Sequence, residues 1–229
     1  MVVRSATHAG SWYSGGGKDL DQELQGWLEG VPKEITEVGP EGGLCKVPVK
    51  GARAIIGPHA GFSYSGPNAA YGYQCINTEN VKRVFLLGPS HHAYLEKCAL
   101  SRCTEYETPL GNIQVDREIR AVMLGRRSDR PSGVPVWQSI ERLDFAGIEA
   151  IEHIDHARFK QYLDETENTI CGRHPIGVLL AAVNALYPAG EQGNESPRLR
   201  FVKYDQSNRV ESVSGSSVSY ASAYLWFPE

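Results

Sequence analysis

Arg53-Ala54-Ile55-Ile56-Gly57-Pro58-His59 is the stretch from which the architecture of this chain can be worked out. A second stretch, Arg83-Val84-Phe85-Leu86-Leu87-Gly88-Pro89-Ser90-His91-His92, repeats its order of a basic residue, a short apolar run, a Gly-Pro break and a histidine. Apolar runs of this length are typical of fully buried strands. Proline ends a strand because it lacks a backbone donor and fixes its own φ. We therefore predict strands at 54–57 and 84–87, each followed by histidine.

The spacing of the two runs favours a parallel pair. Gly57 and Gly88 are 31 positions apart, which suits one strand–helix–strand unit, with a crossover helix between 67 and 77. Such a crossover makes the two strands parallel and is nearly always right-handed. Ligands of open parallel sheets bind beyond the carboxyl ends of the strands. We therefore expect His59 and either His91 or His92 to face one cleft.

The remaining pattern predicts a single α/β domain over residues 1–229, with layered helices around a mixed sheet. Gly, Pro, Glu and Lys dominate 30–50, which we interpret as an exposed loop. The predicted helices are 18–29, 116–124, 137–152, 156–167 and the run after Pro175; the predicted strands are a hairpin about Pro109 and Gly111 and a pair at 199–204 and 217–221; the predicted link is 125–135.

Composition excludes several classes of protein. The formal net charge is -4 and there is no long basic run, so we expect no nucleic-acid partner. No apolar stretch approaches the ~20 residues of a membrane span, and no apolar segment follows the amino terminus as in a signal peptide. We therefore expect a cytoplasmic protein, with the nucleus as a further compartment. Five cysteines without a Cys-x-x-Cys pair argue against a disulfide framework or a structural zinc site.

Cys171 differs from the other cysteines in its surroundings. It comes just before a helix whose first turn contains Pro175, and Arg173 lies two residues after it. A helix N-terminus and a nearby arginine both favour the thiolate form. Cys171 is therefore a candidate metal ligand or nucleophile, and an inert buried thiol is the alternative. His153 and His156 lie among acidic and polar residues and are interpreted as surface histidines.

Five motifs together resemble the Memo family, which is linked to cell motility driven by receptor tyrosine kinases. They occur near both ends of the chain, and their combination is specific. The motifs are His8-Ala9-Gly10-Ser11-Trp12-Tyr13, Pro58-His59-Ala60-Gly61-Phe62-Ser63-Tyr64, Gly88-Pro89-Ser90-His91-His92, Asn168-Thr169-Ile170-Cys171-Gly172-Arg173-His174-Pro175-Ile176-Gly177-Val178-Leu179-Leu180 and Ser216-Ser217-Val218-Ser219-Tyr220-Ala221.

The resemblance implies a fold similar to the class III (LigB-type) non-haem iron dioxygenases. Carried over position by position, it implies metal ligands at His59, His91 and Cys171. Trp12 and Tyr64 match residues that wall the family's pocket. His92 also matches a family position at the pocket, where it is not a ligand.

One departure from the family is large. Memo proteins carry a long middle section with an acidic Glu-His stretch and an Asp-Phe-Cys-His-Trp motif. Here the chain passes from the predicted helix near 124, through the basic link, to Trp137-Gln138-Ser139-Ile140, which already resembles the later part of the family. Loss of inner strands would expose apolar sheet edges.

Three functions remain open. Two imidazoles and a thiolate suit iron, copper or zinc, which predicts a redox-active metal protein with a signalling role linked to motility and the cytoskeleton. This includes a metal-dependent oxidoreductase, but a thiolate in place of the dioxygenases' carboxylate argues against ring cleavage. The second function is a non-enzymatic adaptor that binds a phosphotyrosine peptide in the cleft. The third is a metal- or thiol-dependent hydrolase with Cys171 as nucleophile.

Overall fold

Three antiparallel strands form the centre of the computed structural model, which describes residues 2–79, 81–93, 99–116, 136–188, 196–211 and 216–228. They are β4 (Ala52–Ile56), β7 (Arg198–Gln206) and β8 (Ser219–Trp226). Their order is β4-β8-β7, so β8 pairs with both of the others. The predicted pairing of 199–204 with 217–221 is confirmed by the register, in which Tyr204 lies opposite Ala221.

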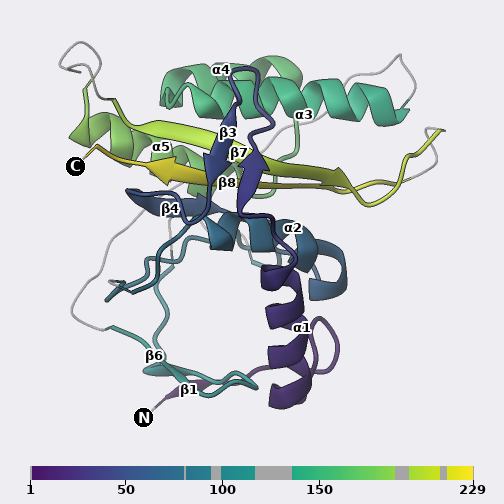
Figure 1. Cartoon of the computed structure of the whole chain (residues 1–229), viewed down its shortest axis with the longest axis vertical. Coiled ribbons are helices and arrows are strands. Elements are labelled where there is room, and N and C mark those ends of the chain that lie inside the picture. Colours follow the sequence, from purple (N-terminus) through teal and green to yellow (C-terminus); the bar gives the residue numbers. More distant parts are fainter. Residues whose placement is uncertain are drawn as a thin grey trace.

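Helices cover both faces of this sheet (Figure 1). Helices α3 (Val136–Glu152), α4 (His156–Thr166) and α5 (Arg173–Leu186) lie on one face. Helix α2 (Phe62–Gln74) lies on the other face, and α1 (Gly17–Glu29) packs against α2. All these helices were predicted from the sequence. The predicted link at 125–135 and most of the predicted helix at 116–124 lie outside the described residues. No helix in the described residues is long and apolar enough to cross a membrane.

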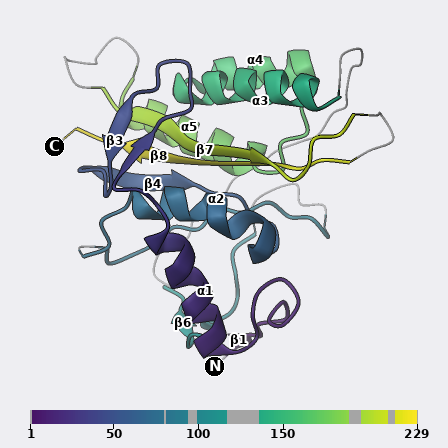
Figure 2. The same ribbon diagram turned by 45° about the vertical axis from the view of Figure 1, so that its right-hand side comes forward.

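Two smaller sheets complete the architecture. Strands β1 (Val3–Arg4), β5 (Glu105–Tyr106) and β6 (Ile113–Gln114) form one, in which β1 and β5 are parallel and β5 and β6 are the predicted hairpin. Strands β2 (Glu34–Thr36) and β3 (Leu44–Lys46) form an antiparallel hairpin. Figure 2 shows the sheet of β1 and β6 at the far end of α1, away from the central sheet. The chain is thus a mixed α/β protein.

Side chains of the central sheet alternate between two hydrophobic cores, because successive residues of a strand point to opposite faces. Leu199 and Phe201 of β7 contact the core under α3–α5, whereas Val202 belongs to the core on the α2 side. A bulge between Phe201 and Lys203 interrupts this alternation. Lys203 consequently lies on the α2 side as well, with its ammonium nitrogen 5.3 Å from the centroid of the Tyr71 ring.

The predicted parallel pair is wrong. Strand β4 forms where expected, but it pairs antiparallel with β8, and residues 84–87 form no strand. Val84, Phe85 and Leu86 are 79%, 70% and 83% exposed. A buried strand needs a partner on at least one edge and a layer over each face, and residues 81–90 have neither among the described residues.

The helix between these segments begins earlier than predicted, at Phe62 rather than near Pro67. The carbonyl of Gly61 accepts the first backbone bonds, from Tyr64 and Ser65. Gly66 faces α1 so closely that a Cβ there would lie 2.3 Å from the Trp27 ring. The absence of a side chain at position 66 therefore lets α1 approach α2.

The expectation of a loop at 30–50 is also wrong, since these residues include the β2–β3 hairpin. Ile35 is 3% exposed and joins the core on the α2 side, where Cys45 and Val47 also pack, so apolar side chains hold the hairpin to the domain. Cys45 and Cys75 also belong to this region, and burial raises the pKa of the first thiol to about 11 and of the second to about 12. Most residues of 30–50 are exposed, as predicted, but composition does not reveal the buried positions Val31 and Ile35.

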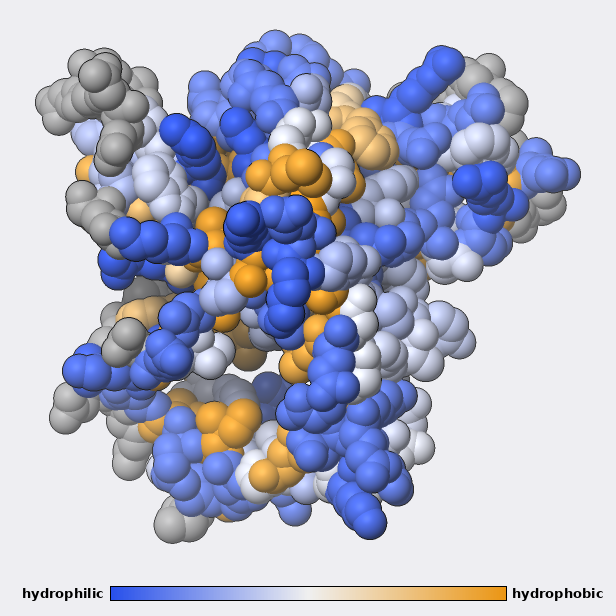
Figure 3. Space-filling model, in the orientation of Figure 1, coloured by the Kyte–Doolittle hydropathy of each residue, from blue (hydrophilic) through white to orange (hydrophobic). Residues whose placement is uncertain are grey.

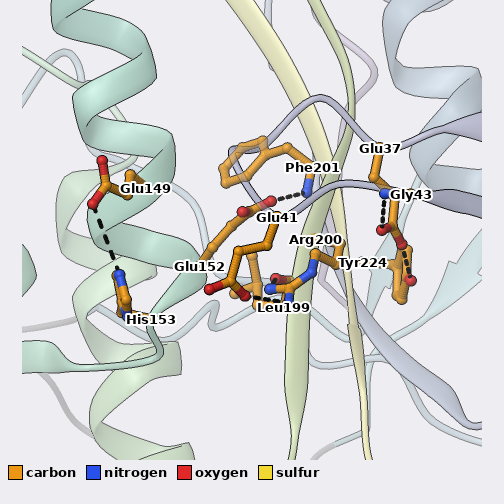
Figure 4. Close-up of polar contacts among 10 residues, drawn as sticks. All are labelled: Glu37, Glu41, Gly43, Glu149, Glu152, His153, Leu199, Arg200, Phe201 and Tyr224. Atoms are coloured by element: carbon orange, nitrogen blue, oxygen red, sulfur yellow. Dashed lines mark hydrogen bonds and ion pairs between the residues drawn. The ribbon is translucent and has the colours of Figure 1, made fainter.

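Carboxylates connect the β2–β3 hairpin to the sheet and to α3 (Figure 4). Glu37 accepts hydrogen bonds from the hydroxyl of Tyr224 at 2.5 Å and from the backbone N–H of Gly43 at 3.0 Å. Glu41 pairs with Arg200 at 3.0 Å. Glu152, at the end of α3, is 7% exposed and accepts the backbone N–H of Phe201 at 2.8 Å. These contacts tie the hairpin, β7, β8 and α3 together.

The surface is hollowed between the part that carries the central sheet and the part that carries α1 and β1 (Figure 3). Hydrophobic residues lie at the rim of this hollow in the view shown. Large hydrophobic side chains in the described part that are about half exposed or more include Val3, Leu100, Leu110 and Ile113. Apart from α1, which packs against α2, the part that carries β1 is therefore less closely packed against the central sheet than the helices are.

Replacing Leu180 should destabilise the core under α3–α5. Leu180 is 0% exposed in α5, so Leu180→Ala should lower the free energy of unfolding by about 2–5 kcal/mol, the usual cost of an unfilled cavity. Leu186 of the same helix is 71% exposed, and Leu186→Ala should change it by less than about 0.5 kcal/mol. Urea titration measures both. Equal losses would contradict this description of the core.

Replacing Glu152 should change how stability depends on pH. Burial raises the pKa of Glu152, although the Phe201 N–H and Arg200 act in the opposite direction. A carboxyl whose pKa is higher in the folded state stabilises the fold at low pH and loses that contribution as the pH rises through its folded-state pKa. Glu152→Gln keeps an acceptor for Phe201 and does not titrate. Its unfolding free energy relative to wild type should therefore increase from about pH 4 to pH 8.

The matched control is Glu29→Gln, because Glu29 is exposed at the end of α1. The difference in unfolding free energy between Glu29→Gln and wild type should vary much less with pH. Glu152→Ala, which leaves the Phe201 N–H without its acceptor, should cost about 1–3 kcal/mol. If the unfolding free energy of Glu152→Gln relative to wild type fell with increasing pH, the raised pKa of Glu152 would be refuted.

Candidate functional site

The first candidate ligand, His59, lies just after β4. Gly57 and Pro58 end the strand, as the sequence predicts. The next turn is fixed to the amino-terminal loop, because the backbone N–H of Phe62 donates to the carbonyl of Trp12 at 2.7 Å. Ser65 adds a hydroxyl bond to the carbonyl of Ala60 at 3.0 Å. These contacts hold the backbone immediately after His59.

The second candidate, His91, reaches the same place without a strand to carry it. Its Nε2 lies 3.2 Å from the Nε2 of His59, and the two ring centroids are 5.3 Å apart. His92 is exposed and is not part of the cluster of candidate metal ligands in the described residues. The expectation of one cleft for His59 and either His91 or His92 therefore resolves to His91.

The third candidate, Cys171, lies in the connection between α4 and α5. The connection is braced by α3 and α4: the amide of Asn168 donates to the Tyr162 hydroxyl at 2.6 Å, and that hydroxyl donates to the carbonyl of Leu143 at 2.8 Å. The guanidinium of Arg173 donates to the carbonyl of Ile170 at 3.0 Å. Helix α5 begins at Arg173, so Pro175 lies in its first turn and Cys171 just before it, as the sequence predicts.

The three side chains come together from distant parts of the sequence. One ligand atom from each of His59, His91 and Cys171 lies within 4.8 Å of the others. Two nitrogens bound tetrahedrally to one ion at 2.0–2.1 Å would be about 3.3–3.4 Å apart, close to the 3.2 Å between the two Nε2 atoms. All three residues are exposed, so a bound ion could also accept ligands from solvent. The donors present thus fit one transition-metal ion.

The electrostatics at His59 favour neutral imidazole. Burial, and secondly the neighbouring His91, lower the pKa of His59. A neutral imidazole nitrogen has the free lone pair that a metal ion requires. Burial, and secondly Arg173, likewise lower the pKa of His174, which lies beside the Cys171 connection.

The predicted wall residues lie on the surface beside the first ligand. Trp12 is 49% exposed and stacks obliquely on His8, with ring centroids 5.0 Å apart. Tyr64, in the first turn of α2, is 68% exposed. Both approach Gly61, two residues beyond His59. They therefore present exposed aromatic surface next to the turn that positions this ligand.

A cavity of about 190 Å³ between α3, α5 and β7 was not predicted from the sequence. Glu41, Glu152, His153 and Arg200 contribute to its lining. His153 was interpreted as a surface histidine; its side chain is 43% exposed and its Nε2 lies 3.8 Å from Glu149. Glu149 and Glu152 lie in the last turn of α3 and His153 directly follows it, so their closeness was visible in the sequence, but their proximity to Arg200 depends on the packing of α3 against β7.

Comparison with known proteins gives a consistent result. A family model described as "Memo-like protein" matches residues 4–132 and 125–224. The chain is 32% identical to Protein memo-1 homolog of Caenorhabditis elegans over 98% of its own length and 83% of that protein. It is 32% identical to Protein MEMO1 of Danio rerio and 31% identical to Protein MEMO1 of Homo sapiens, in each case over 98% of both chains.

These alignments also locate the departure from the family. The alignment with the human protein has 308 positions and covers 98% of this chain; 98% of 229 residues is about 224, so about 84 positions have no residue here. The two matched stretches meet at residues 125–132, where the sequence predicts the link. Despite this missing section, the matches cover nearly the whole chain, and the protein belongs to the Memo-like family.

Proposed function

We propose that this chain binds a single redox-active metal ion, iron or copper, through His59, His91 and Cys171. The observation that carries the proposal is the convergence of their ligand atoms within 4.8 Å. The thiolate favours copper(I) among the softer ions, imidazole suits both metals, and zinc would also be accepted by this set of donors. When bound, iron or copper would supply one-electron chemistry.

The protein's own part in such chemistry is to hold the ligands and to leave them accessible. The turn after β4 fixes His59, and the Tyr162–Asn168 bond braces the connection that contains Cys171. Exposure of all three ligands supports exchange of small oxidants and reductants with solvent. We infer a signalling or redox role in the cytoplasm or nucleus, linked to cell motility and the cytoskeleton as the family resemblance implies. Ring cleavage is not part of the proposal, because Cys171 stands where the similar dioxygenases have a carboxylate.

Metal analysis of the purified protein tests this proposal. Wild type loaded with Fe(II) or Cu(I) under anaerobic conditions should retain about one equivalent, and His91→Ala and Cys171→Ser should each lower the affinity at least ~10-fold, as expected for loss of a coordinating side chain. EPR of the oxidised samples should show a signal that changes in Cys171→Ser. Circular dichroism should show unchanged secondary structure in both variants.

The chain offers a matched control for each substitution. His92→Ala removes the adjacent histidine, and Cys103→Ser removes another partly accessible thiol. Both should retain the metal. If His92→Ala lost as much metal as His91→Ala, or if wild type bound neither iron nor copper, the proposed centre would be excluded; retention of zinc alone would exclude its redox role.

A second candidate function is supported by two exposed aromatic residues near the turn after His59. Trp12 and Tyr64 are 49% and 68% exposed, Trp12 stacks on the imidazole of His8, and exposed rings of this kind could hold a phosphotyrosine side chain of a signalling protein. Fluorescence anisotropy with a phosphorylated peptide and its unphosphorylated twin tests this. Specific binding should be weakened at least ~10-fold by Trp12→Ala, a typical cost for an interface aromatic. Equal affinity for the two peptides would refute the adaptor.

A further inference from the structure

Residues 84–87 form an apolar surface that the fold leaves uncovered. Val84, Phe85, Leu86 and Leu87 are 79%, 70%, 83% and 48% exposed. With ordinary side-chain areas, these four residues expose on the order of 500 Å², which is large for one contiguous patch on a monomer. Scattered apolar residues on a surface need no explanation, but four in succession do.

The backbone of the same segment is also available. No backbone hydrogen bond joins residues 82–92 to another residue that the structure describes. The segment is nevertheless held at two points: Arg83 binds Asp116 at 2.7 Å, and His91 contacts His59. It is thus presented to solvent between two anchors, with both its apolar side chains and its backbone groups placed to pair.

The comparison with relatives supplies a reason for this exposure. About 84 aligned positions of the human relative have no counterpart in this chain, and the family match breaks at 125–132. The chain thus combines an uncovered, strand-like apolar run with the loss of a section that its relatives possess. Among the described residues, nothing pairs with this run or with the outer edge of β4.

We propose that a second copy of this chain covers the segment, by antiparallel pairing of residues 83–87 across a two-fold axis at Phe85. In this register Val84 lies opposite Leu86 of the other copy, and the two Phe85 side chains meet. The basic pair Lys82 and Arg83 of one copy then lies at the opposite end of the ribbon from the same pair of the other copy. A parallel arrangement would instead set Lys82 and Arg83 against their own copies, which is unfavourable for like charges.

The area of the patch suits a weak dimer. Complete burial of these four residues in both copies would remove on the order of 1,000 Å², which is the lower limit for a specific interface; a two-stranded ribbon leaves part of each face exposed and buries less than this. The two-fold arrangement uses the same surface on both copies and is closed, so assembly should stop at two chains. We therefore expect a dimer that dissociates on dilution in the micromolar range.

Light scattering with size-exclusion chromatography, from about 1 to 200 µM, tests the dimer. Wild type should change from monomer to dimer over this range. Leu86→Glu and Val84→Lys should each remain monomeric, because each places two unpaired charges in the interface. Both side chains are exposed in the monomer, so the circular dichroism spectra should match wild type. Leu44→Glu and Leu186→Glu, which add a charge at other exposed leucines, should dimerise like wild type.

Mixing the two charged variants tests the register. In a mixed dimer, the lysine introduced by Val84→Lys lies opposite the glutamate introduced by Leu86→Glu, and the unchanged Leu86 and Val84 form the other pair. An equimolar mixture should therefore recover dimer that neither variant forms alone. Recovery distinguishes this pairing from general loss of folding. The proposal is overturned if wild type is monomeric at all concentrations, if it forms assemblies larger than two, if Leu186→Glu is as impaired as Leu86→Glu, or if the mixture stays monomeric.

Discussion

The hydrogen-bonded ladder of β8 with β4 and β7 is the constraint on which the rest of the structure depends. It brings the carboxyl-terminal residues of the chain between two segments from its first and last thirds. Alternate residues of the ladder belong to the core under α3–α5 and to the core against α2. A disturbance of β8 would therefore reach both layers at once. The candidate site depends on the same ladder. His59 directly follows β4, and Cys171 directly precedes α5, which packs on one face of the ladder.

Local patterns predicted the helices and the long hairpin well. The apolar periodicity of α4 and α5 is contained in the sequence, as is the alternation of β7 and β8, and each structure forms from neighbouring residues or a direct return of the chain. The segments 54–57 and 84–87 show that a local pattern does not predict whether a strand forms. They have the same local pattern, yet one is a central strand and the other is exposed, because β8 is available to the first and no described strand pairs with the second. Pairing partners are a non-local property that a run of five residues does not encode.

The candidate site was predictable to a similar, partial extent. The Gly-Pro breaks predicted that His59 and either His91 or His92 would lie just past the ends of two strands. The structure brings the rings of His59 and His91 together even though only one of the two expected strands exists. Their meeting therefore does not require the parallel pair from which it was inferred. The helix start and Arg173 made Cys171 a candidate ligand or nucleophile by itself, but only the family resemblance joined it to the histidines, because nothing in its spacing relates it to them. The cavity beside Glu152 was not predicted, because Glu152 and Arg200 come together only when α3 packs against β7.

The unequal placement of the thiols has a consequence for how oxidants would meet this protein. Cys45 and Cys75 lie in the core beside α2, where the raised pKa of each keeps sulfur protonated at neutral pH, and thiols in that form react slowly with peroxides and disulfides. Cys171 is exposed at the turn before α5. Oxidative damage or repair at the candidate centre could thus proceed without touching the sulfurs that support the hydrophobic interior, so the chemistry of the surface and the integrity of the fold are kept apart.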